Sequence, residues 1–422
     1  MIENAENMER ALAVAYGKKG GDRELALEYL DELEFLAETA GAEVVEKIYQ
    51  ELPHPNKAYM IGKGKVYEIA EIIEEEDIKL VLFDNDLSPV QLRNLEQKLN
   101  VKVVDRSGLI LDIFAQHAQT LEARTQVELA QSQYLLPRLT RMWTHLSKQY
   151  GGIGTKGPGE TQIETDRRIL RTKIQRLKQK LEDIDTQKQQ QRKGRDDYPT
   201  YALVGYTNAG KSTLMNKLTR ADVYVQNQLF ATLDTTVRSF NFSNGQKALM
   251  SDTVGFIRKL PTHLVASFRS TLTEARNADV LLHVVDVSHN YFREQIQVVN
   301  ETLKFLKIQD TPQILVLNKM DMVEDRYELM AAQEEYPNSI LVSAQESINT
   351  DKLLELMQRK FDEQSKTYEI LLPYSQMQLV QKIYTFADIV SRDDTDDGVA
   401  FSLRISRDKE DFFNNHFSQY AV

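Results

Sequence analysis

The sequence contains no cysteine and a single tryptophan among its 422 residues. The lack of cysteine excludes disulfides, thiolate-bound metals, iron–sulfur clusters and cysteine nucleophiles. Any chemistry must therefore use oxygen and nitrogen groups. A reducing compartment, the cytoplasm, is the location we expect.

The sequence also lacks a long apolar run. The longest runs, at 280–287 and 314–317, fall far short of the roughly 20 residues that a membrane-spanning helix needs. The first residues are acidic, whereas a secretory signal begins with basic residues followed by an apolar stretch. We therefore expect no membrane span.

Basic residues are outnumbered by acidic ones, 52 to 63, and the formal net charge is −11. However, residues 138–195 hold 15 Lys or Arg and only six Asp or Glu, a local balance of +9 that leaves −20 for the remainder. A basic segment in an acidic protein can bind the phosphate backbone of a nucleic acid. Composition alone favours a simpler interpretation, a solvated helix face.

Strand and helix patterns alternate in the first part of the chain. Such alternation predicts a parallel sheet with crossover helices. A chain of this length forms about two to four domains, and we predict that the first is a small α/β domain at residues 1–118. Its strands are expected at 11–15, 79–83 and 101–104, and its helices at 23–40 and 88–99.

From residue 119 the pattern is helical, with an interruption by the glycine-rich segment 151–159. Thr161 followed by Glu164 matches a capping box and predicts the start of a helix. Apolar residues then recur at helical spacing in one stripe, and basic residues cover much of the remaining surface. We predict a basic two-helix arm at 119–196 with its glycine-rich tip at 151–159. The stripe consists of Ile163, Leu170, Ile174, Leu177, Leu181 and Ile184.

Strand and helix alternation returns at residue 197. It predicts a mostly parallel sheet flanked by helices up to residue 364. A small C-terminal α/β domain is predicted at 365–422. The apolar runs expected to form strands lie at 201–204, 281–287, 313–317, 340–342, 368–372 and 399–405, and a helix is expected near 376–385.

A glycine-rich motif follows the first strand of this sheet and opens a helix, which is the context of a phosphate-binding P-loop. Its backbone N–H groups and the helix N-terminus would bind phosphate. Lys211 would reach the β- and γ-phosphates, and Ser212 would ligate Mg²⁺. The motif is Gly205, Tyr206, Thr207, Asn208, Ala209, Gly210, Lys211 and Ser212, with Thr213 next.

Two further motifs, each after a predicted strand, indicate which base is bound. The carboxylate of Asp321 can accept from N1–H and the 2-amino group of guanine, and adenine offers neither donor. The Ala344 N–H is placed to contact guanine O6. The motifs are Asn318, Lys319, Met320 and Asp321, and Ser343, Ala344 and Gln345.

Two segments are expected to sense the terminal phosphate. Asp252 would hold Mg²⁺ through water, and the Gly255 N–H would contact the γ-phosphate. A switch loop must supply one threonine to complete the Mg²⁺ shell, but spacing alone does not choose among the three available. The segments are Asp252, Thr253, Val254 and Gly255, and Phe230, Ala231, Thr232, Leu233, Asp234, Thr235 and Thr236.

Phe256 stands where many GTPases place a glutamine that orients the attacking water. A phenyl ring cannot hydrogen-bond to water, so we predict slow intrinsic hydrolysis, with the missing group supplied from elsewhere. The alternative is that Phe256 packs in the core and another side chain orients the water. Asn208 suggests that K⁺ bound beside the phosphates stimulates turnover.

Together these motifs resemble those of the HflX family of translational GTPases, over essentially the whole chain. The specific segments are 205–212, 230–234, 252–256 and the unusual Gly-Gly-Ile-Gly-Thr-Lys-Gly-Pro-Gly-Glu-Thr-Gln at 151–162.

The resemblance implies a GTPase that binds the large ribosomal subunit and its rRNA, is stimulated by the ribosome, and helps split stalled or idle ribosomes under stress. It implies that Thr232 is the switch threonine, which ligates Mg²⁺ and acts with Lys211, Asp252 and Gly255 in catalysis. The glycine-rich tip would approach the peptidyl transferase region. Thr235 stands where many relatives have proline.

Two other functions fit the residues. One is a GTP-switched regulator of a non-ribosomal protein, with the arm as a dimerising coiled coil. The other is a GTPase of ribosome assembly or RNA modification. The interpretation as a ribosome-splitting GTPase assumes a monomer.

Overall fold

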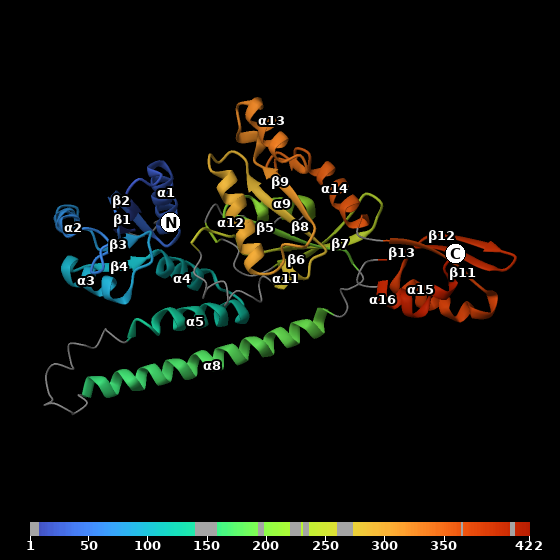
Figure 1. Ribbon diagram of the computed structural model, residues 1–422, viewed down its shortest axis with the longest axis horizontal. Coiled ribbons are helices and arrows are strands. Elements are labelled where there is room, and N and C mark those ends of the chain that lie inside the picture. Colours follow the sequence, from blue (N-terminus) through green and yellow to red (C-terminus); the bar gives the residue numbers. More distant parts are fainter. Residues whose placement is uncertain are drawn as a thin grey trace, which may run out of the picture.

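The computed structural model describes residues 8–139, 158–192, 198–219, 229–230, 236–259, 273–363, 366–405 and 410–422. Three sheets follow one another along the chain, with a long helical arm between the first two (Figure 1). The predicted α/β class is confirmed. Within the described ranges, no helix is both long and apolar enough to cross a membrane.

The N-terminal sheet has the strand order β2-β1-β3-β4, and all its strands are parallel. Strand β2 and helices α2 and α4 were not predicted. Strand β2 is an edge strand whose residues are mostly exposed or half-buried, so it lacks the apolar run that marks the other strands. The elements are β1 (Glu9–Lys18), α1 (Arg23–Thr39), β2 (Ala42–Leu52), α2 (Lys63–Glu75), β3 (Leu80–Phe83), α3 (Pro89–Leu99), β4 (Lys102–Asp105) and α4 (Arg106–His117).

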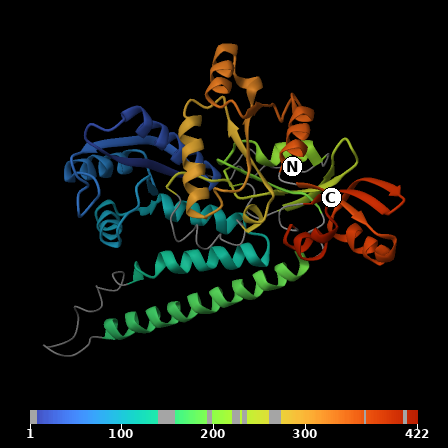
Figure 2. The ribbon, with the colours of Figure 1, turned by 45° about the vertical axis from the view of Figure 1, so that its right-hand side comes forward.

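The arm consists of α5 (Leu121–Leu135) and α8 (Pro158–Arg192), which lie side by side (Figures 1 and 2). The predicted stripe faces α5, since Leu177 is buried and Leu170, Ile174, Leu181 and Ile184 are half-buried. The predicted helix start at Thr161 is wrong. Helix α8 begins at Pro158, because proline loses no hydrogen bond in the first turn of a helix.

The six-stranded sheet has the order β10-β9-β8-β5-β7-β6, and only β6 is antiparallel to its neighbour. Strand β6 was not predicted. The elements are β5 (Thr200–Gly205), α9 (Lys211–Thr219), β6 (Thr236–Asn241), β7 (Lys247–Asp252), α11 (Thr273–Arg276), β8 (Val280–Asp286), α12 (Phe292–Phe305), β9 (Gln313–Asn318), α13 (Arg326–Glu335), β10 (Ser339–Leu341) and α14 (Thr350–Asp362).

The C-terminal sheet is antiparallel, with the order β11-β13-β12. Strand β12 was not predicted, because the acidic run Asp393, Asp394, Asp396 and Asp397 hides it. The elements are β11 (Lys366–Leu372), α15 (Val380–Phe386), β12 (Asp388–Thr395), β13 (Gly398–Ile405) and α16 (Glu410–His416).

The N-terminal domain and the domain of the six-stranded sheet share one apolar core. Phe230 reaches into the N-terminal domain, where its ring meets that of Phe114 edge-to-face, with centroids 4.6 Å apart. Tyr206, Val254 and Ile257 belong to the same cluster of buried residues. Phe230 and the residues that follow Asp252 are therefore packed against the first domain.

Candidate nucleotide-binding site

Four loops predicted to bind a nucleotide lie at the carboxyl ends of neighbouring parallel strands. In open α/β sheets, this edge is where ligands bind. The P-loop follows β5, residues 252–255 end β7 and continue beyond it, residues 318–321 end β9, and residues 343–345 follow β10. The sheet thus brings together motifs that lie up to 140 residues apart in the sequence.

The P-loop backbone passes so close to Asn318 that its last residue before Lys211, Gly210, has no room for a side chain. Gly210 has φ +90°, and a Cβ there would lie 2.3 Å from Nδ2 of Asn318. Only glycine adopts this conformation without strain. The P-loop can therefore pass directly beside the base-recognition loop.

Lys211 lies at the centre of the P-loop. Its ammonium donates to the carbonyl oxygens of Gly205 (3.1 Å) and Tyr206 (2.7 Å). Burial lowers the pKa of Lys211 to about 8, against an opposing effect of Asp252. A phosphate beside this ammonium would restore the favourable interaction that burial removes. The geometry fits the predicted role of Lys211.

Ser212 and Asp252 meet at one point beside the P-loop. The Ser212 hydroxyl donates to Oδ2 of Asp252 over 2.5 Å, and Asp252 is buried. A hydroxyl beside a carboxylate is the oxygen-rich donor set that Mg²⁺ prefers. These residues therefore fit the ion predicted for them.

Asn318 links two loops. Its Nδ2 donates to the carbonyl of Ala209 (2.9 Å), and its Oδ1 accepts from the Ala344 N–H (3.0 Å). The Ala344 N–H was expected to contact guanine O6. Because it already donates to Asn318, it would have to donate to both oxygen atoms at once to do so. In this structure Asn318 acts as a clamp between the P-loop and the loop at 343–345.

The groups beside Asn318 have separate roles. Lys319 has φ +62° and forms an ion pair of 2.6 Å with Asp286 at the end of β8, a partner that sequence analysis missed. Asp321 is exposed, so its carboxylate is accessible to a base. Met320 is half-buried and packs against the apolar core.

Gly255 lies against the P-loop. A Cβ there would lie 2.9 Å from Cα of Thr207 and 3.0 Å from Nζ of Lys211, so any larger residue would displace these groups. The next residue, Phe256, is 2% exposed and packs in an apolar cluster under the sheet. Its ring is therefore part of the core, which is the alternative that sequence analysis left open.

The remaining predicted residues are only partly described. Residues 231–235, which include Thr232 and its neighbours Ala231, Leu233 and Asp234, lie outside the described residues. Phe230 is described, and its side chain contacts the N-terminal domain. The Thr253 hydroxyl donates to the Leu203 carbonyl (2.6 Å) inside the sheet.

The phosphate loop, the Ser212–Asp252 pair and the guanine-type motif at 318–321 meet at one sheet edge. This arrangement defines a P-loop GTPase.

Known families match successive parts of the chain. The family described as "GTP-binding GTPase N-terminal" matches residues 27–115, "GTP-binding GTPase Middle Region" matches 117–195, and "50S ribosome-binding GTPase" matches 200–319. The "GTPase HflX" of Flavobacterium psychrophilum is 54% identical over 315 residues, 75% of this chain and 76% of that protein. The "GTPase HflX" of Caldanaerobacter subterraneus subsp. tengcongensis is 42% identical over 408 residues, 96% of this chain and 93% of that protein.

The chain belongs to the HflX family of GTPases. Among solved structures, it is similar to a GTP-binding protein from Sulfolobus solfataricus in complex with GDP, with 26% identity and a TM-score of 0.44 over 84% of this chain and 98% of that chain.

Proposed function

We propose that this GTPase is a GTP-controlled switch that binds the large ribosomal subunit through rRNA and helps to split stalled or idle ribosomes under stress. The observation that carries the proposal is the basic surface of α8, on a chain whose GTPase region matches a family described as 50S ribosome-binding. The protein would act as a cytoplasmic monomer made of units 1–118, 119–196, 197–364 and 365–422.

The basic residues of α8 are available to a partner. Only Lys173 and Lys188 form ion pairs with α5 among the described contacts, with Glu128 and Glu122. An exposed row of cations on a rigid helix suits the closely spaced phosphates of RNA. The exposed basic residues are Arg168, Arg171, Lys173, Arg176, Lys178 and Lys180.

The nucleotide cycle would work through Mg²⁺ held by Ser212 directly, by Asp252 through water and by Thr232. The ion neutralises charge on the β- and γ-phosphates. We also propose that Asn208, which is exposed with φ +59°, helps to hold K⁺ beside the phosphates. GTP binding would favour the ribosome-bound shape, and hydrolysis would release the protein for another round.

Charge removal on α8 tests the RNA contact. We expect the triple variant Arg168→Ala, Arg171→Ala and Lys178→Ala to bind the large subunit more weakly. The slope of log K against the logarithm of the salt concentration should become less steep by about two to three, because each lost phosphate contact removes about 0.7–0.9 from it. The matched control removes three exposed lysines outside the arm, Lys57, Lys217 and Lys352. An equal effect of both triple variants would contradict the proposal.

Replacement of residues 151–159 by a short turn tests the tip. We expect GTP turnover without ribosomes to stay unchanged, while stimulation by ribosomes and subunit splitting are lost. Retained splitting would refute the role of the tip. Stronger binding to precursor particles than to mature subunits would favour a GTPase of ribosome assembly, and no cosedimentation with ribosomes would favour a regulator of another protein.

The order of the steps can be tested separately. If binding energy separates the subunits, a nonhydrolysable GTP analogue should support splitting once per protein molecule. Splitting that requires hydrolysis would reverse this order.

A further inference from the structure

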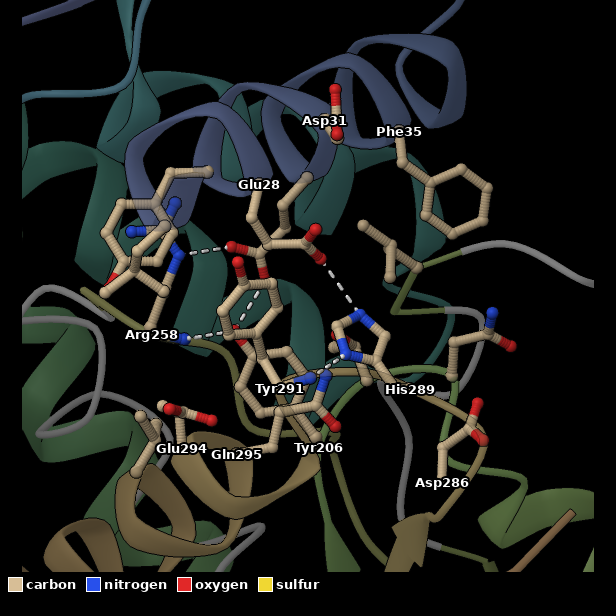
Figure 3. Close-up of a pocket in the computed structure, with 17 residues that line it drawn as sticks. Glu28, Asp31, Phe35, Tyr206, Arg258, Asp286, His289, Tyr291, Glu294 and Gln295 are labelled. Atoms are coloured by element: carbon tan, nitrogen blue, oxygen red, sulfur yellow. Dashed lines mark hydrogen bonds and ion pairs between the residues drawn. The ribbon is translucent and has the colours of Figure 1, made fainter. Parts of the chain in front are cut away.

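A cavity of about 290 Å³ lies between helices α1 and α12 and the P-loop (Figure 3). We refer to it as the α1–α12 cavity. Small-molecule sites in proteins measure about 300–1,000 Å³, so its volume suits a small, slender ligand. Figure 3 shows Glu28 of α1 on one side and Glu294 and Gln295 of α12 on the other. None of these three residues belongs to a nucleotide-binding motif.

Carboxylates dominate the polar lining of the α1–α12 cavity. Five of them line it, against one guanidinium, that of Arg258, and one imidazole, that of His289. Three of the five form ion pairs with lysine or arginine. In the part of the chain that the structure describes, Glu28 and Glu294 have no lysine or arginine partner. The three paired carboxylates are Asp31, Glu32 and Asp286.

Glu28 is hydrogen-bonded but keeps its negative charge. Nδ1 of His289 accepts from the Tyr291 N–H (3.1 Å), so Nε2 carries the proton of the ring and donates to Oε1 of Glu28 (3.0 Å). An imidazole makes this hydrogen bond in its neutral form. The side chain of Glu28 is 31% exposed, and its carboxylate has lone pairs left for a further donor.

Tyr291 reports the charge at this end of the cavity. Burial raises the pKa of its phenol, and four carboxylates raise it further. Negative charge nearby favours the neutral phenol over the phenolate, so the carboxylates create a negative potential beside the ring. A cation is attracted both by this potential and by the face of an aromatic ring. The four carboxylates are Glu24, Asp22, Glu28 and Glu294.

Thr207 adds a buried acceptor to the lining. It is 7% exposed, and its Oγ1 has no hydrogen-bond partner within the described ranges. The methyl group of Thr207 lies against Gly255, which leaves the hydroxyl on the side of the cavity. Oε1 of Gln295 is also buried and without a partner there. Because buried polar atoms are normally hydrogen-bonded, these two oxygen atoms suit a ligand that donates hydrogen bonds.

The carboxylates of the cavity are too widely spaced for a metal ion. Among the described residues, no group of three or more His, Asp or Glu could hold one. A linear polyamine carries its charges several bonds apart, so it can reach carboxylates on opposite walls at once. Its methylene chain can pack against the apolar side chains of the lining. These include Leu25, Phe35 and Val298.

We propose that the α1–α12 cavity binds a linear aliphatic polyamine, with one ammonium group at Glu28 and another at Glu294. The methylene chain lies between the aromatic and apolar side chains. Thr207 and Gln295 accept hydrogen bonds from the remaining N–H groups. The bound polyamine thus connects a carboxylate of the N-terminal domain with one of the GTPase domain.

Titration of the full-length, nucleotide-free and RNA-free protein with spermidine tests the proposal. Calorimetry at constant ionic strength should show one site that binds spermidine at least about tenfold more tightly than n-butylamine, because a monoamine reaches only one carboxylate. Mg²⁺ should not displace spermidine at equal concentrations of charge. Attraction to an acidic protein in general follows charge alone, so displacement by Mg²⁺, or equal affinity for the monoamine, would overturn the proposal.

Removal of the two charges locates the site. The double variant Glu28→Gln with Glu294→Gln should bind spermidine about 100-fold more weakly, since two charge-assisted hydrogen bonds are lost. The matched control is Glu334→Gln with Glu355→Gln, which removes two exposed carboxylates elsewhere and should leave the affinity unchanged. Unchanged GDP affinity in both double variants verifies that they are folded. Equal weakening in both would overturn the proposal.

The hydroxyl of Thr207 provides an independent test. Thr207→Val keeps the shape of the side chain but removes the acceptor, and it should weaken spermidine binding by roughly tenfold. Thr207→Ser retains the hydroxyl and should restore most of the affinity. Spermidine binding that is unaffected by Thr207→Val, or is weakened equally by Thr207→Ser, would overturn the proposal.

Discussion

Replacement of Arg106 by leucine should destabilise the N-terminal domain by about 3–5 kcal/mol, the usual cost of breaking a buried ion pair by removing one partner. The side chain of Arg106 is 1% exposed and lies 2.6 Å from Glu32 and 2.8 Å from Asp84. Leucine fills part of the space but forms no ion pair. Glu32 and Asp84 would then pair only with Arg258 and Lys259 of the GTPase domain. Hydrogen exchange of the β3 amides at increasing urea measures the free energy of opening.

The control is Arg10→Leu. Arg10 pairs with Glu76 over 2.7 Å, but the two side chains are 42% and 49% exposed, and such a pair contributes less than about 1 kcal/mol.

The loss caused by Arg106→Leu should depend on pH. In the native protein, Arg106 lowers the pKa of Glu32 and Asp84, so the stability that it adds is present above the ordinary values of 4.5 and 3.8 and is lost as pH falls below them. The difference between variant and native protein should therefore be largest at neutral pH and shrink as the pH falls below about 4. A loss no greater than that of Arg10→Leu, or one independent of pH, would refute this reasoning.

Three further predictions concern the nucleotide. Asp321→Asn should weaken GTP binding at least about 100-fold and favour xanthosine triphosphate, whose 2-oxo group suits the amide; unchanged base preference in competition binding would contradict guanine recognition by Asp321. Gly255→Ala should lower GTP turnover at least about tenfold and weaken GDP binding as well, since its Cβ would lie 2.9 Å from Cα of Thr207 and 3.0 Å from Nζ of Lys211 and would displace these P-loop groups; normal turnover would show that the P-loop accommodates the methyl group. Asn208→Ala should abolish the excess of turnover in K⁺ over Na⁺ at saturating GTP, and equal turnover of the unmodified protein in both salts would remove the K⁺ hypothesis.

Local rules predicted the nucleotide loops well. Each motif follows an apolar strand, and the carboxyl ends of parallel strands meet at one edge, so the meeting of Ser212 with Asp252 and of Asn318 with the P-loop follows from sequence order and topology. The pairing of Lys319 with Asp286 could have been suspected, since Asp286 also ends a strand of this sheet.

The contacts between domains were beyond prediction. Glu32 and Arg258 are 226 residues apart, and neither belongs to a motif with a recognisable spacing. Their contact depends on how two independently formed sheets pack, which no local periodicity encodes. The mistaken helix start at Thr161 has a different origin, because two start signals, Pro158 and the capping box, lie within one turn of each other.

The continuity of α8 has a mechanical consequence. Its 35 residues span about 52 Å at 1.5 Å per residue, and the chain continues from its C-terminal end into β5, the strand that ends in the P-loop. A helix of this length acts as a lever. Tilting it by about 5° about its C-terminal end would sweep the opposite end through roughly 4–5 Å, so that a small rotation before the start of β5 becomes a displacement as large as a nucleobase.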